Sequence, residues 1–296
     1  MPMIVDPTVP QPGPPAVITS PDGWLTAVVD GPWAGVYLAV DYTAGTPLGR
    51  AADVRQVLLV RQDPGAAAPV PVRSGDLAWA VEGVGQAYDH EAPLGVAVAY
   101  TARPLYADGT WGPTSSLAVV VPAPAPGETR DMWIKSIEAP GLSLRVMLGP
   151  TEGTTSAGRQ DTASRSGSPY TAIAYDTAAA AAETVSIDVL AEDIIGFREL
   201  VRSGVLLAQV RPGYHKPDRY FVPGDVSEKP TGKLGATGGY TATFDIVPIE
   251  RPATSGQPMC APGWSYDQLA AQFATYDAVA ASFPSYAALA TNSAIT

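Results

Sequence analysis

The chain of 296 residues has a formal net charge of −11, and 46% of its residues are hydrophobic while 16% are charged. This composition excludes a disordered chain, because it supplies enough apolar surface for a core. The acidic excess argues against sequence-independent nucleic-acid binding, which needs basic patches. The 29 glycines and 30 prolines favour short strands joined by many turns, and the length predicts about two domains.

The first residues, Met1 to Val17, lack the basic and apolar regions of a signal peptide, and no apolar run is long enough to span a bilayer. Cys260 is the sole cysteine, so an intrachain disulfide is impossible. We therefore expect folding in a reducing cytoplasm and no membrane insertion. The proline-rich residues 1–14 are expected to form an extended arm, either disordered or docked onto a neighbour.

Residues 15–121 are predicted to form an immunoglobulin-like sandwich, because short strand patterns alternate there with turn signals such as Asp63-Pro-Gly. The absence of a Cys…Trp…Cys pattern excludes an antibody-type domain. The end of this region, residues 97–121, resembles the last hairpin of fibronectin type III domains, which implies a fibronectin III-like form of the sandwich. The predicted strands are Trp24–Val29, Gly35–Tyr42, Arg55–Arg61, Leu77–Val81, Gly95–Tyr106 and Ser115–Val121.

Residues 122–129 begin as an alternating Pro/Ala tract, which favours a stiff extended backbone without donors at its prolines. We interpret this tract as a strut between two modules that holds the first module outward from the second.

Residues 130–252 are predicted to form a second β-sandwich or split barrel with one packed helix. Thr184–Leu190 places apolar residues at every second position, as in a half-buried strand. The helix is expected near Glu192–Ser203, because acidic residues lie in its first turn and Gly204 follows its end. The polar stretch 149–168 is interpreted as a long loop, either disordered or ordered only against a neighbouring subunit.

Residues 253–296 form a tail with a repeat of ten residues, in which Ser or Thr precedes Tyr and an aliphatic residue follows. Ser and Thr can cap helices, so we expect short helical pieces that begin anew at each repeat. The tail either closes its own domain or docks into a groove of another subunit, the second being favoured. The predicted docking residues are Trp264, Tyr266, Leu269, Phe273, Tyr276, Val279, Phe283, Tyr286 and Leu289.

Motifs of catalysis are not found in the sequence. Glu192 and Asp193 are explained by a helix start, and His90-Glu91 is not followed by the second histidine of a zinc protease motif. With two histidines and one cysteine, a structural zinc or a catalytic triad is not expected. The sequence therefore predicts a non-enzymatic protein without metal or other cofactor.

Three features together resemble the minor tail proteins of actinobacterial siphophages. They are the strand entry Tyr88-Asp-His-Glu-Ala-Pro-Leu-Gly, the order of elements from Val185 to Glu228, and the repeated Tyr units of the tail. The resemblance implies a virion component near the tail tip that is made in the host cytoplasm. It also implies contacts with other tail-tip proteins and a homo-oligomeric ring, which we expect to hold three or six copies. The last repeat has Tyr286 where the family usually has Trp.

An alternative function is binding of host-surface carbohydrate by the first module. Sugars stack on flat aromatic side chains beside polar groups, and Tyr106 and Trp111 are the candidates for such a glycan contact. Trp111 lies between Gly109 and Pro113, where an ordinary hairpin contact is the competing interpretation.

Overall fold

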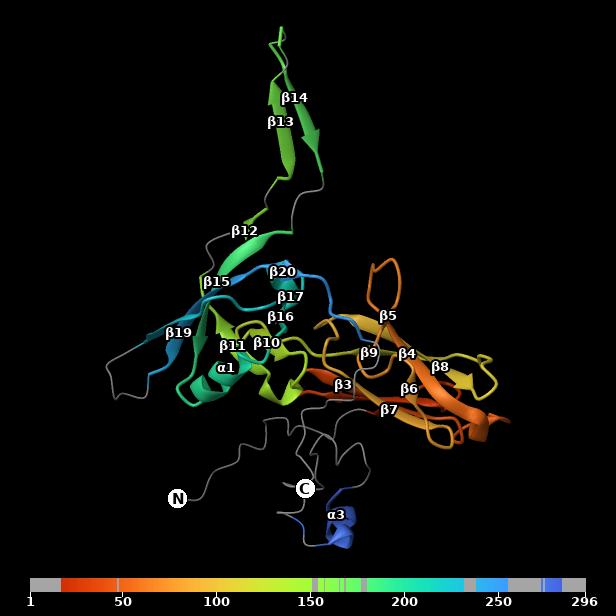
Figure 1. Ribbon diagram of the computed structural model, residues 1–296. Helices are drawn as coiled ribbons and strands as arrows, with labels where there is room; N and C mark the ends of the chain where they lie inside the picture. The colour runs from red at the N-terminus through yellow and green to blue at the C-terminus, as the bar shows by residue number, and fades with distance from the viewer. Residues whose placement is uncertain are drawn as a thin grey trace, which may run out of the picture.

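The computed structural model describes residues 17–46, 48–150, 154–156, 158–164, 166–167, 169–176, 180–231, 238–254, 273 and 275–283. Within these residues the fold is mainly β, with antiparallel sheets and two short α-helices, α1 and α3 (Figure 1). The predicted mainly β fold is therefore confirmed. The expected arm at residues 1–14 lies outside the described residues.

Two sheets make up the first module. One has the order β1-β2-β3-β7, and the other has the order β5-β4-β8-β9, with β6 paired to β4. Their bounds are β1 (Val17–Thr19), β2 (Leu25–Asp30), β3 (Gly35–Asp41), β4 (Val54–Gln62), β5 (Val70–Pro71), β6 (Ala78–Trp79), β7 (Val84–Asp89), β8 (Ala97–Tyr106) and β9 (Ser115–Val120). The sequence patterns located six of these strands to within a few residues but did not identify β1, β5 or β7.

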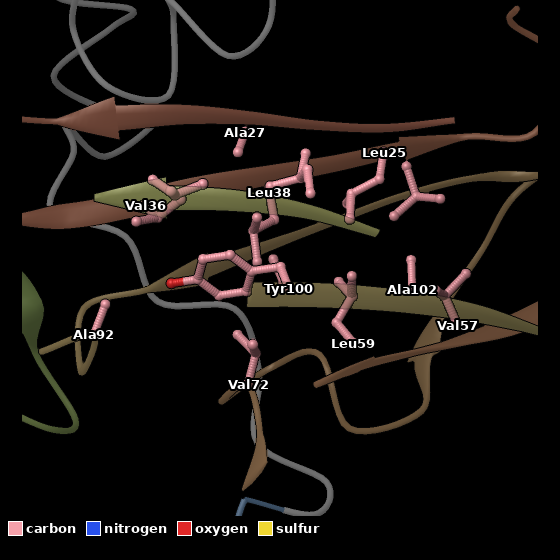
Figure 2. Packing of buried hydrophobic residues seen from close by; sticks show 14 of the residues in the cluster. Leu25, Ala27, Val36, Leu38, Val57, Leu59, Val72, Ala92, Tyr100 and Ala102 are labelled. Carbon is pink, nitrogen blue, oxygen red and sulfur yellow. The ribbon is translucent and has the colours of Figure 1, made fainter. Parts of the chain in front are cut away.

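The core of this module lies between its two sheets, as Figure 2 shows. Successive side chains of a strand point to opposite faces, and every second residue of β8 is accordingly buried. Tyr100 of β8, Leu59 of β4 and Leu38 of β3 meet in this core. Full burial of one such side chain contributes about 1.5–3 kcal/mol relative to exposure.

The second module is a nine-stranded sheet with the order β18-β19-β15-β11-β10-β16-β17-β20, to which β12 adds by pairing with β15. The bounds are β10 (Met132–Ser136), β11 (Leu144–Leu148), β12 (Thr154–Thr155), β15 (Ala182–Val189), β16 (Leu206–Val210), β17 (Arg219–Phe221), β18 (Ser227–Pro230), β19 (Tyr240–Ile246) and β20 (Pro248–Ile249). Only Val247 separates β19 from β20, although the two strands lie near opposite ends of this order. The sheet must therefore curve strongly, as in a split barrel.

Helix α1 (Ile194–Leu200) packs on the inside of this curved sheet. Ile194, Phe197 and Leu200 are buried with the second core cluster, as the spacing of three residues requires for one helix face. Gly204 follows in the left-handed region at φ 101°, which a side chain would strain. The predicted helix at Glu192–Ser203 is confirmed, with shorter bounds.

The stretch 149–168 is not simply a loop, which corrects the prediction. Its described residues include β12 and the strand β13 (Gln160–Ser164), which pairs with β14 (Thr171–Tyr175). The side chains of β13 are polar or small and show no apolar alternation, so the pattern could not identify this strand. We name the hairpin formed by β13 and β14 the arm.

In the tail, helix α3 (Tyr276–Ser282) confirms one of the expected helical pieces. The side chain of Thr275 accepts a hydrogen bond from the backbone N–H of Ala278, which is the predicted capping interaction. The first and last repeats lie outside the described residues.

Candidate functional site

Strand β10 contributes to both modules, because successive side chains of a strand point to opposite faces. Met132 and Ile134 point into the core of the second module, whereas Trp133 belongs to the core cluster of the first. All five residues of β10 are buried, because both faces of the strand are covered. The second sheet therefore packs its outer face directly against the first module. We name this contact, with the polar residues described next, the joint.

Lys135 of β10 is fully buried in the joint, at 0% exposure. Its Nζ donates hydrogen bonds of 2.8 Å to the backbone oxygens of Ala34 and His90, both in the first module. Beside it, Gln209 of β16 donates through Nε2 to the backbone oxygen of Ala92. Two neighbouring strands of one module thus bind the backbone of the other.

The carboxylate of Asp89 is held by groups of the first module. Nη1 of Arg61 donates to both of its oxygens, at 3.0 and 2.8 Å, and the hydroxyl of Tyr100 donates to Oδ2 at 2.9 Å. Arg61 also pairs with Asp63. This network holds the start of the segment 89–92 in place, so that its backbone oxygens face Lys135 and Gln209.

Glu91 joins the modules through two guanidinium groups. Arg73 of the first module donates to Oε1 at 2.8 Å, and Arg251 of the second donates to Oε2 at 2.6 Å. Arg251 also donates to the backbone oxygen of Pro71, and Arg73 donates to that of Ala253. Segments far apart in the sequence therefore share one buried carboxylate.

The pKa values of side chains in the joint depend on two opposing causes. Burial disfavours the charged form of a group, and pairing with an opposite charge favours it. Burial lowers the pKa of Lys135 to about 7 despite the nearby carboxylates. Asp218 accepts a hydrogen bond of 2.7 Å from Nε2 of Gln209, and loss of solvent around its carboxylate raises its pKa to about 6. For Asp89, burial opposes ionisation, but the charge and hydrogen bonds of Arg61 prevail and lower its pKa to about 2. Burial lowers the pKa of His90 to about 4.

The Pro/Ala tract does not separate the modules. Ala123 packs against the core of the first module, and Pro124 is buried. The contacts of Lys135 and Glu91 join the modules within hydrogen-bond distance. The predicted strut that holds the first module outward is therefore wrong, because strand β10 follows the tract and packs directly on the module that precedes it.

The arm extends away from the two modules (Figure 1). Its strands form a two-stranded sheet of their own, in which Thr162 is opposite Ile173. All of β13 is exposed, and Ile173 of β14 is 56% exposed. Among the described residues of the arm, no side chain is buried.

Four of the predicted docking residues are described. Phe273 and Phe283 meet edge to face at 5.8 Å, and Phe283 is buried, whereas Tyr276 is 86% exposed and Val279 is partly exposed. The phenylalanines thus contact each other across one repeat. Trp264, Tyr266, Leu269, Tyr286 and Leu289 lie outside the described residues.

The two predicted glycan contacts differ in accessibility. Tyr106 is buried, with the guanidinium of Arg50 4.3 Å from its ring centre, whereas Trp111 is 40% exposed. The pair therefore does not present two open rings. Sequence reasoning missed Trp79, which is 77% exposed on β6. The sequence placed Trp79 in the predicted strand Leu77–Val81, but its pattern did not show which face of the strand would be exposed.

In the part of the chain that the structure describes, no group of three or more His, Cys, Asp and Glu side chains is arranged to hold a metal ion. None of the described helices has the length and apolar character needed to cross a membrane. No protein-family model and no curated protein matches the chain.

Proposed function

We propose that the chain is a non-enzymatic structural component of a bacteriophage tail tip, which assembles with further copies of itself and with other tail proteins. It is made in the host cytoplasm and becomes part of the virion tail. The proposal continues the resemblance carried by Tyr88–Gly95, by the order of elements after Val185, and by the repeated tail.

The observation that carries the assembly role is the arm. An isolated two-stranded hairpin is at best marginally stable in water, and its outer strand edges present unpaired backbone groups. A neighbouring subunit that covers β13 or β14 would satisfy those groups and bury Ile173. The arm therefore fits a subunit contact better than it fits a part of the free chain.

The joint supports a structural role as well. All four oxygens of Asp89 and Glu91 accept hydrogen bonds from Arg61, Arg73, Arg251, Tyr100 or the backbone. Glu91 thereby holds the two modules together, Asp89 fixes the backbone beside it, and neither carboxylate is placed to take a proton from a substrate. A firmly joined pair of modules suits a component that bears load in an assembly.

The finer identity of the first module belongs to the same proposal. The order β2-β3-β7 facing β5-β4-β8-β9 supports a fibronectin III-like sandwich, with β1 added at one edge. Such a module supplies a rigid surface for contacts with neighbouring tail proteins.

The proposal is tested by the mass of the purified chain, measured by light scattering after gel filtration, for three versions of the protein. These are the full chain, a variant in which Gly-Gly replaces residues 158–176, and a chain that ends at residue 261. We expect the full chain to form a closed oligomer and both shortened forms to have a smaller mass. Immunogold labelling of phage particles that carry the protein should mark the end of the tail.

The unfolding midpoint serves as the control, because neither deletion touches the joint. A monomeric full chain at all concentrations tested would refute self-assembly. Unchanged mass after removal of residues 158–176 would refute the role of the arm, and unfolding of the chain that ends at residue 261 would show that the tail closes a domain instead of docking.

A further inference from the structure

The outer face of the sheet β5-β4-β8-β9 carries two exposed tryptophans in one lateral row. Residues directly opposite each other on paired strands point to the same face. Trp79 is opposite Gln56, Gln56 is opposite Leu105, and Leu105 is opposite Trp111. The four side chains therefore follow one another across the sheet, with an indole at each end.

The strand spacing sets the separation of the two indoles. Three steps between neighbouring strands place their backbone positions about 14 Å apart. Val57 and Pro104, which neighbour Gln56 and Leu105 in the chain, are buried on the opposite face, as the alternation requires. The row therefore lies on the solvent side of a well-packed sheet and cannot turn inward without disturbing the core.

Polar side chains are placed in and beside this row. The guanidinium of Arg103 lies 5.1 Å from the ring centre of Trp111, and its Nε donates to the backbone oxygen of Gly112 at 3.3 Å. Gln56 donates through Nε2 to the backbone oxygen of Leu77 at 3.2 Å, which orients its amide. Arg103 lies two residues before Leu105 on β8, and therefore on the same face of the sheet, opposite Leu58.

We propose that this row binds an extended, neutral polysaccharide, with one sugar ring on Trp79 and another on Trp111. Sugar rings have apolar C–H faces that stack on indoles, while their hydroxyls form hydrogen bonds with amides and guanidinium groups between the rings. A separation of about 14 Å spans several sugars of one chain, so a single sugar would not reach both indoles. The net charge of −11 disfavours an anionic polymer.

This inference is independent of the assembly role. It keeps the carbohydrate alternative but moves it from Tyr106, which is buried, to Trp79, which is open. It also separates the glycan face from the arm, which belongs to the other module. Failure of glycan binding would leave the proposed tail component untouched, and a monomeric chain would leave the glycan row untouched.

The test is calorimetric titration of the full chain with cellohexaose and with chitohexaose, which are neutral extended oligosaccharides, and with glucose as the length control. We expect binding of at least one hexamer and none of glucose. Trp79→Ala and Trp111→Ala should each weaken the affinity for the hexamer about tenfold, because each removes one ring on which a sugar stacks. Trp79→Tyr should retain most of the affinity because it keeps a flat ring.

Ile195→Ala is the control, because Ile195 is a 70% exposed apolar residue on helix α1 of the second module, outside the row, the arm and the tail. Its affinity should equal that of the unchanged protein, and all variants should keep the same unfolding midpoint. Absence of binding to both hexamers at millimolar concentration would overturn the proposal. So would a loss of oligomer mass in Trp79→Ala without loss of glycan binding, which would assign Trp79, with the exposed Val81 and Val84, to a protein contact.

Discussion

The joint and the arm differ in what covers their polar groups. In the joint, charged side chains from both modules are buried, and their partners lie within the same chain. In the arm, polar side chains face solvent, and the two strands pair with each other in a sheet of their own. A buried charge demands a partner wherever the chain folds, whereas an exposed hairpin gains its stability when another surface covers it.

This difference teaches how one chain can be firm in one place and adaptable in another. Removal of one partner from a buried ion pair leaves the other charge without compensation, so the joint tolerates little change. Substitution of exposed residues on the arm should hardly change the free energy of unfolding. It should change assembly where a neighbouring subunit contacts those residues. Matched substitutions in the two regions should therefore have opposite readouts, one in stability and the other in assembly.

The largest expected effect is that of Glu91→Gln in the joint. The neutral amide removes the counter-charge of both Arg73 and Arg251. Its oxygen can still accept from one guanidinium, but its own NH₂ faces the other, which also loses its acceptor. We expect a loss of about 3–5 kcal/mol in the free energy of unfolding, measured by urea denaturation. The unfolding of the two modules should also separate into two transitions in calorimetry, since Glu91 binds Arg73 and Arg251 at once.

The matched change in the arm is Asp161→Asn, which neutralises an exposed carboxylate on β13. Its effect on the free energy of unfolding should stay within about 0.5 kcal/mol. If the two substitutions had equal effects on stability, the contrast between the joint and the arm would be lost.

The next effect is an alkaline pH dependence from Lys135. Its pKa is about 7 in the folded chain and 10.5 for the free side chain, because burial disfavours the ammonium form. Between these values the unfolded chain binds more protons, so this group makes stability rise as pH increases from 7 to 9. Lys135→Met should flatten that slope, measured as the unfolding midpoint at successive pH values. A variant with the full slope would show that the lysine does not titrate in the joint.

Much of the fold could be predicted from local patterns. The strand Val54–Gln62 alternates buried and partly exposed residues, and helix α1 begins after acidic residues and ends before Gly204. These signals lie within a few neighbouring residues, where side-chain period and turn chemistry decide the structure. Strand β7 escaped because Gly85 interrupts its pattern.

The joint could not be predicted, because its partners are far apart in the sequence. Glu91 binds Arg73 and Arg251, and only the folded chain brings the three together. The one local signal was Lys135, which follows the apolar residues Met132–Ile134 within a predicted strand, where a buried lysine must find acceptors. The motif Tyr88–Gly95 was recognised as a resemblance, while its role as the buried contact required the structure.

The smallest expected effect is the acid response of the joint, because two groups oppose each other. His90 has a pKa of about 4 against an ordinary 6.5, because burial disfavours its charged form. The unfolded chain therefore binds more protons between these values, and this group makes stability fall as pH decreases from 6.5 to 4. Asp218, whose pKa is raised to about 6 from 3.8 because its carboxylate loses solvent, acts in the opposite direction between pH 6 and 3.8.

His90→Phe should consequently make the unfolding midpoint less sensitive to acid, and Asp218→Asn should make it more sensitive. The two variants, compared by thermal unfolding at pH 4 and pH 6.5, must change the slope in opposite directions, and a change in the same direction would refute the titration assigned to His90 and Asp218.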